Sequence, residues 1–232
     1  MSYPEKIHEQ AAEIIARYPE GHSRSALLPL LHLVQSHDGY ITEAGTAFCA
    51  EALGLTKAQV QAVSTFYTMY KREPTGDWLV SVCTNTLCHV KGGQRIYDAL
   101  SEELGVDHDQ TTPDGTVTLE HAECLAACDY APVVTVNYEY FDEMDEAGAL
   151  DLVRELREGK RPNPSRGAPL CTLRETSVQL AGFEEERSAG LEGNASGEPT
   201  LAGARLAAEA GVTAPAFDPD APLLAKDKEE AK

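Results

Sequence analysis

Several features that define classes of protein are scarce or missing in this chain of 232 residues. No stretch approaches the roughly 20 consecutive apolar residues that a membrane-spanning helix needs. The N-terminal residues carry Glu5 and Glu9 where a secretory signal would be basic and then apolar. We therefore expect a cytoplasmic protein that does not insert into a membrane by itself.

Positive charge is also scarce. The chain has 19 lysine and arginine residues against 38 aspartate and glutamate residues, which gives a net charge of −19 at pH 7. A polyphosphate backbone would be repelled by such a chain, so nucleic acid is excluded as a partner. The remaining composition, with 42% hydrophobic and 25% charged residues, is typical of a globular protein.

Two catalytic motifs are absent from the sequence. There is no C-x-x-C pair, which a thioredoxin-type dithiol enzyme carries at the start of a helix. There is also no G-x-G-x-x-G after a predicted strand, and the Gly92-Gly93 pair alone is a weak signal of nucleotide binding. Hydride transfer from a nicotinamide cofactor is therefore not expected of this chain by itself.

The N-terminal part, residues 1–74, is predicted to be a helical bundle. Apolar residues recur near the helical period in Ser25 to Gln35 and again in Thr42 to Leu53. Thr56-Lys-Ala-Gln59 fits a capping box, which starts a further helix. The turn-forming run Glu73-Pro-Thr-Gly-Asp77 then predicts a domain boundary near residue 75.

A second domain is expected over residues 75–162. Trp78 to Cys83 is apolar and β-branched, Gly93 to Leu104 is typical of a helix, and Thr116 to Glu120 is a second strand. A strand, a helix and a strand in this order form a βαβ unit with parallel strands and a right-handed crossover.

The rest of this domain completes a known pattern. Pro132 to Val136 predicts a third strand, Asn137 to Tyr140 an antiparallel fourth, and Asp145 to Glu158 a helix. The order β-α-β-β-β-α predicts an α+β fold with a thioredoxin-like sandwich. The remaining residues, 163–232, are rich in Pro, Gly, Ala and Glu and predict an extended tail, in which Leu170 to Phe183 is apolar enough to dock on a partner.

The six cysteines are the candidate functional residues of the sequence. In a reducing compartment they indicate metal binding or catalysis rather than disulfides. Cys83 and Cys88 form a C-x4-C pair at the end of the first strand, and Cys124 and Cys128 form a C-x3-C pair after the second. Parallel strands of a βαβ unit end on the same side of the sheet, so the two pairs are predicted to meet.

Two kinds of metal site fit four thiolates. A [2Fe–2S] cluster needs two cysteines for each iron, and structural zinc takes four cysteines in pairs of similar spacing. Gly92 and Gly93 favour the anionic cluster, because they let backbone amides and a positive helix end approach it. His89 and His121 lie nearby without the C-x-H arrangement of a mixed cluster, so we expect them to be exposed or outside the ligand set.

The other two cysteines are not expected to be ligands. Cys49 lies in a helical apolar pattern and is predicted to be a small buried hydrophobe, and Cys171 has no partner nearby in the sequence.

These motifs carry a family resemblance. Cys-x4-Cys followed by Glu123-Cys-Leu-Ala-Ala-Cys-Asp-Tyr-Ala-Pro132-Val-Val resembles the NuoE family of NADH-quinone oxidoreductase, the thioredoxin-like [2Fe–2S] component of respiratory complex I. Leu27 to Gln35, Gly39-Tyr-Ile and Val63 to Tyr70 extend the resemblance over residues 7 to 160. It implies that Cys83, Cys88, Cys124 and Cys128 are the cluster ligands.

The resemblance also implies a function and partners. The chain would exchange single electrons with the flavin of a partner, the flavin- and NADH-binding subunit (NuoF-like), beside an adjacent iron–sulfur subunit (NuoG-like). FMN and NADH would be bound by that partner, and the complex would hold the chain at the cytoplasmic membrane. A diaphorase subunit of an NAD-linked hydrogenase or formate dehydrogenase, and a zinc-stabilised interaction domain, are the alternatives.

Two local expectations accompany this resemblance. Ala127 stands where the family motif is expected to have glycine, which should shift the loop only slightly. Pro132 precedes the third strand, where thioredoxin-like folds often place a cis-proline, and we expect a cis peptide bond there.

Overall fold

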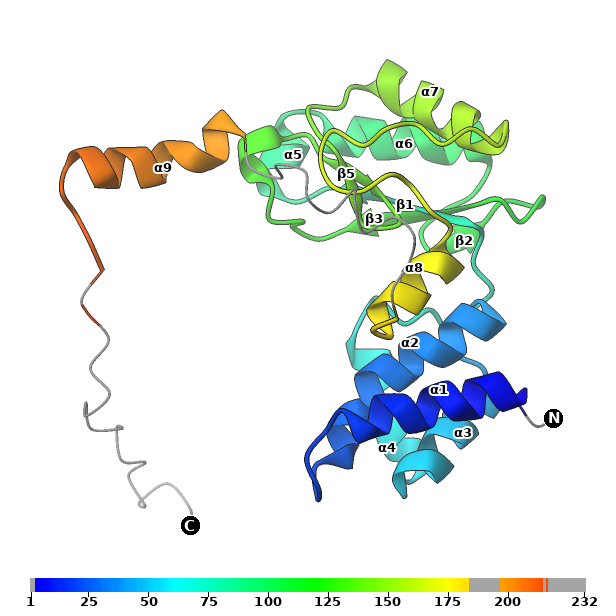
Figure 1. Ribbon diagram of the computed structural model, residues 1–232. Coiled ribbons are helices and arrows are strands. Elements are labelled where there is room, and N and C mark those ends of the chain that lie inside the picture. The colour runs from blue at the N-terminus through cyan, green and yellow to red at the C-terminus, as the bar shows by residue number, and fades with distance from the viewer. Residues whose placement is uncertain (1–2, 184–196, 215, 217–232) are drawn as a thin grey trace, which may run out of the picture. The chain divides into compact units, whose positions relative to one another are not determined.

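The computed structural model describes residues 3–183, 197–214 and 216. Residues 1–195 and residues 196–232 form two compact units. The first unit contains a helical bundle and a five-stranded sheet (Figure 1). Among the described residues of the second unit, Glu198–Glu209 form helix α9.

The N-terminal bundle agrees with the predicted helical pattern. Its elements are α1 (Glu5–Ala16), the short 3-10 helix η1 (Ser23–Ala26), α2 (Leu27–Asp38), α3 (Glu43–Leu53) and α4 (Lys57–Phe66). The predicted capping box is confirmed, because the Thr56 side chain accepts a hydrogen bond from the Gln59 amide and the Gln59 side chain accepts one from the Thr56 amide. Leu30, Leu31 and Val34 of α2 lie fully buried in the bundle core.

The sheet has the predicted parallel centre. Its strands are β1 (Trp78–Cys83), β2 (Gln110–Thr111), β3 (Val117–Ala122), β4 (Val134–Val136) and β5 (Glu139–Phe141), in the order β2-β3-β1-β4-β5. β1 and β3 are parallel, and β4 is antiparallel to both β1 and β5. The very short β2 is not evident in the sequence, because its two polar residues leave no apolar pattern.

The two faces of the sheet differ in chemistry. Helices α6 (Gly93–Leu104) and α7 (Glu146–Arg157) cover one face, where alternate residues of β1 such as Val80 and Val82 enter a large apolar core (Figure 1). The intervening residue Ser81 and its neighbours Thr118 and Thr135 are buried polar side chains. The opposite face is therefore suited to polar contacts.

Lys71 lies on this polar side of the sheet and contacts both the bundle and the sheet. Its amide donates to Gln35 Oε1 at 2.8 Å, which fixes its backbone to α2. Its Nζ reaches Glu120 Oε1 on β3 at 2.8 Å, and Ser81 Oγ donates to Glu120 Oε2 at 2.6 Å. The side chains of Lys71 and Glu120 are only 8% and 14% exposed, so this ion pair is largely removed from water.

The structure corrects the expected extended tail in part. Leu173–Leu180 form helix α8, which packs along α2, and α9 is also helical (Figure 1). Thr172 and Glu175 form a capping box at the start of α8, and Gln35 Nε2 donates to Ser177 Oγ at 3.3 Å. Within the apolar stretch Leu170 to Phe183, α8 therefore docks on this chain's own bundle, while Leu170 lies in the core of the sheet domain. Residues 184–196, 215 and 217–232 of the expected tail lie outside the described residues.

Within the described ranges, no helix combines the length and the apolar composition that crossing a membrane requires.

Candidate iron–sulfur site

The parallel strands β1 and β3 bring the two cysteine pairs to one end of the sheet. Cys83 is the last residue of β1, and it is aligned with Ala122, the last residue of β3. The Thr84 amide donates to the Ala122 carbonyl at 3.2 Å, which keeps the strand ends together. Cys124 follows two residues after Ala122, so both cysteine loops leave the sheet side by side.

The first loop is shaped by a short helix and a close backbone approach. Asn85 caps helix α5 (Thr86–Val90), which carries Cys88. Gly93, the first residue of α6, packs so tightly that a β-carbon there would lie 2.4 Å from the Cys83 carbonyl oxygen. A side chain at position 93 would clash with the backbone of the first loop, so this loop can pack on α6 only with glycine there. Asn85 Nδ2 also donates to Glu123 Oε2 at 2.7 Å, which ties the first loop to the second.

The second loop folds its two cysteines together. The Sγ atoms of Cys124 and Cys128 are 3.6 Å apart, and the Ala126 amide donates to Cys124 Sγ at 3.4 Å. Ala126 takes the left-handed conformation, with φ of 58°. Ala127 has φ of −116°, a value open to any residue, so the loop accommodates its β-carbon. The Ala131–Pro132 bond that follows is cis, as expected.

The four thiols differ in exposure. Cys83 and Cys88 are 2% and 3% exposed, whereas Cys124 and Cys128 are exposed. Burial, followed by a hydrogen bond with Cys83, raises the pKa of Cys88 to about 12. A hydrogen bond with Cys124 raises the pKa of Cys128, and the Cys83 charge adds to that effect. The raised pKa of both thiols favours their protonated form in the metal-free chain.

The residues present fit a [2Fe–2S] cluster. Two thiolates at about 2.3 Å from one tetrahedral metal lie roughly 3.8 Å apart, close to the 3.6 Å between Cys124 and Cys128. Such a cluster needs one pair of thiolates for each iron, and the chain supplies two pairs. In the described ranges, no group of three or more potential ligand side chains is gathered around a single ion position. Thiolates are the ligand form, so binding would release the protons that the raised pKa values retain.

Both neighbouring histidines are exposed and Cys49 is buried, as expected, whereas Cys171 is buried beside α8 and not placed in an extended tail. His89 and His121 are exposed, and His121 Nδ1 lies 3.3 Å from Thr84 Oγ1. Cys49 is fully buried in α3, and burial raises the pKa of its thiol to about 12. Cys171 is 3% exposed and its Sγ lies 3.2 Å from Thr176 Oγ1, at the start of α8.

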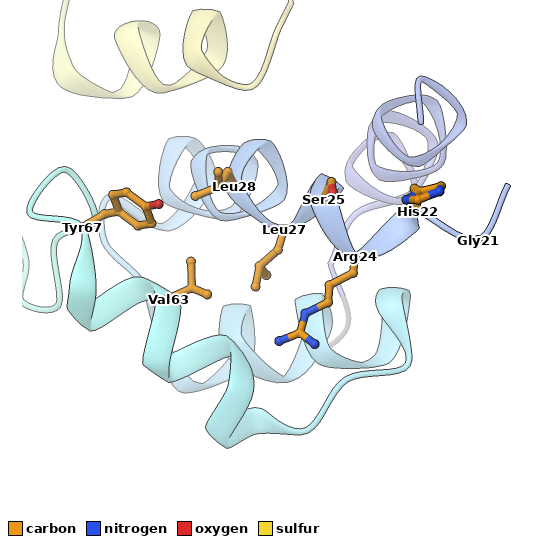
Figure 2. Close-up of a pocket in the computed structure, with 8 residues that line it drawn as sticks. All are labelled: Gly21, His22, Arg24, Ser25, Leu27, Leu28, Val63 and Tyr67. Carbon is orange, nitrogen blue, oxygen red and sulfur yellow. The ribbon is translucent and has the colours of Figure 1, made fainter. Parts of the chain in front are cut away.

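Two hollows mark the surface of the first unit. A polar groove of about 740 Å³ extends from Cys124 along the polar face of the sheet to Lys71 and Glu120. A smaller hollow of about 440 Å³ lies on the helical bundle, between α2 and α4, with Leu28, Val63 and Tyr67 on its wall (Figure 2). The second hollow has no cysteine among its lining residues, so of these two hollows the groove is the one that adjoins the candidate site.

A thioredoxin-like sheet with two cysteine pairs at one end defines the class of thioredoxin-like [2Fe–2S] ferredoxins. The family model described as thioredoxin-like [2Fe-2S] ferredoxin matches residues 11–157. The chain is 56% identical over 218 residues to the E subunit of the Mycobacterium bovis NADH-quinone oxidoreductase, and the match covers 92% of this chain and 85% of that protein. The chain therefore belongs to the NuoE family, the E subunits of NADH-quinone oxidoreductases.

More distant proteins match the same core. NADH-quinone oxidoreductase subunit 2 of Thermus thermophilus is 37% identical over 150 residues, which covers 64% of this chain and 83% of that protein. The crystal structure of an NAD+-reducing [NiFe]-hydrogenase in the air-oxidised state matches with a TM-score of 0.52 at 20% identity, over 57% of this chain and 23% of that chain. The hydrogenase match shows a shared fold.

Proposed function

We propose that this chain is the electron-transfer subunit of an NADH:quinone oxidoreductase and that Cys83, Cys88, Cys124 and Cys128 hold its [2Fe–2S] cluster. The observation that carries the proposal is the placement of the two cysteine pairs at the same end of the sheet, after the aligned ends of β1 and β3, with the Sγ atoms of the second pair 3.6 Å apart. Membership of the NuoE family supports the assignment to this complex.

The two cysteine pairs differ in their exposure to water and to a partner. Cys83 and Cys88 are buried beside Val133 and Ala131, so their side of the site is shielded from water. Cys124 and Cys128 are exposed, so their side is open to a partner. The bound cluster supplies one-electron exchange, and the chain sets the reduction potential through charge, hydrogen bonds to sulfur and burial.

The partners follow from the complex. The flavin- and NADH-binding subunit (NuoF-like) oxidises NADH, and the adjacent iron–sulfur subunit (NuoG-like) completes the peripheral assembly. The chain's place at the cytoplasmic membrane comes through that assembly. A diaphorase subunit of an NAD-linked hydrogenase is the second candidate, because the hydrogenase structure shares the fold, and copurifying proteins distinguish the two.

NADH should reduce the cluster only when the flavin-bearing partner is present. The cluster-loaded chain and that partner are mixed without oxygen, NADH is added, and the electron paramagnetic resonance spectrum is recorded on frozen samples. We expect a reduced-cluster signal from the mixture and none from the chain with NADH alone. A chain that stays oxidised beside a partner that reduces ferricyanide with NADH would contradict the proposed electron exchange.

A further inference from the structure

A segment beyond the family match runs along the outer strand of the sheet. After α7 the chain turns back past β5 before it enters α8 (Figure 1). The Ser165 amide donates to the Tyr140 carbonyl at 2.8 Å, and Tyr140 and Arg166 form an antiparallel bridge. The family model ends at residue 157, so the residues after α7 that make this contact lie outside the part of the chain that the model matches.

The segment places one cation over two aromatic rings. The Arg166 Cζ atom lies 4.1 Å from the ring centroid of Tyr140 and 4.9 Å from that of Tyr130. Both distances are within the roughly 6 Å at which a guanidinium is attracted to a ring face. Arg166 also donates two hydrogen bonds to the Asp142 carboxylate, at 2.9 and 3.3 Å. The two side chains are only 20% and 9% exposed, so their charges are poorly screened.

Both rings belong to the surroundings of the cysteines. The Tyr140 hydroxyl donates to the Leu125 carbonyl at 3.0 Å, and Leu125 lies between Cys124 and Cys128 in the second loop. Tyr130 ends the 3-10 turn that begins at Cys128. Both tyrosines pack against the apolar cluster that contains Cys83 and Cys88. Arg166 is therefore linked to the cysteine loop by contacts with two neighbouring side chains.

We propose that Arg166 is a positioning residue for the loop between Cys124 and Tyr130, and that the Arg166–Asp142 pair sets the charge beside the site. The inference rests on the proposed cluster site. An added electron makes the cluster more negative, so the Arg166 cation favours the reduced state and the Asp142 anion opposes it. Neutralising one partner leaves the charge of the other uncompensated.

Reduction potentials of four full-length variants test the electrostatic part. We expect Arg166→Gln to lower the potential, Asp142→Asn to raise it, and the double variant to lie near wild type. Arg161→Gln is the matched control, because Arg161 is 51% exposed and lies over Trp78, away from the cysteine loops. A merely structural role would shift both single variants in one direction, and that result, or no shift, would overturn the charge assignment.

Hydrogen exchange of the loop tests positioning without any cluster. In the apoprotein, the Tyr130 amide, which donates to the Ala127 carbonyl, should exchange faster in Arg166→Gln and in Tyr140→Phe than in wild type. Lysine keeps the charge of Arg166 but lacks its planar two-point contact. Arg166→Lys should therefore exchange faster than wild type as the apoprotein, whereas its reduction potential, measured with the cluster bound, should stay near that of wild type. Unchanged exchange in all three would refute positioning. A wild-type chain that binds no cluster would refute the proposed function instead, and the exchange result would still stand.

Discussion

Alanine at Cys83, Cys88, Cys124 or Cys128 is expected to cause near-complete loss of the cluster from the purified chain. Each substitution leaves one iron with a single protein thiolate, and a [2Fe–2S] cluster requires two at each iron. The measurement is iron and sulfide content together with visible absorption, after anaerobic purification. All four variants should fail alike, although two of the cysteines are buried and two are exposed.

Cys49 and Cys171 provide matched controls for this experiment. Both side chains are buried, as those of Cys83 and Cys88 are, but they lie in α3 and just before α8. Alanine at either position creates a small cavity while the cysteine pairs stay intact, so cluster content should equal that of wild type. Retention of a full cluster in a Cys124→Ala chain would show that another residue completes the ligand set.

Lys71→Met is expected to destabilise the apoprotein by about 3 kcal/mol, because it leaves the Glu120 carboxylate largely buried without its cation. The expected loss of stability is large because Lys71 Nζ lies 2.8 Å from Glu120 Oε1 and both side chains are mostly hidden from water. Denaturant-induced unfolding of the full chain measures the free energy. The double variant Lys71→Met with Glu120→Met should recover most of it, because an apolar pair of similar size replaces the ions.

Lys160→Met is the control for the loss of a lysine. Lys160 pairs with Glu158 at 2.8 Å, but these side chains are 58% and 62% exposed. Exposed pairs contribute at most about 1 kcal/mol, so the unfolding free energy should change little. Equal effects of Lys71→Met and Lys160→Met would mean that the link between the bundle and the sheet contributes no special stability.

The parts of this fold that follow from local pattern are predictable from the sequence. Apolar period and capping chemistry locate the bundle helices and α6, and the βαβ rule brings the ends of β1 and β3 together. Because that rule places the ends of parallel strands on one side of the sheet, the sequence alone predicts that the two cysteine pairs meet. The domain limits at residues 74 and 162 stay a prediction.

Other features depend on tertiary contacts that leave little trace in local sequence. Arg166 is far from the cysteines in sequence, and it reaches the loop only through the packing of Tyr130 and Tyr140. The buried Lys71–Glu120 pair joins the bundle to the sheet across a similar distance in sequence. Helix α8 does carry a local signal, namely the capping box of Thr172 and Glu175, but the Pro- and Gly-rich composition around it favours an extended tail.

The most direct test of the cluster assignment is the metal content and reduced-state spectrum of the intact chain, purified without oxygen with iron and sulfide available. We expect about two irons and two sulfides per chain and a rhombic electron paramagnetic resonance signal on reduction. A colourless chain with stoichiometric zinc would contradict the assignment, because the same four thiolates would then form a structural site with no electron to exchange.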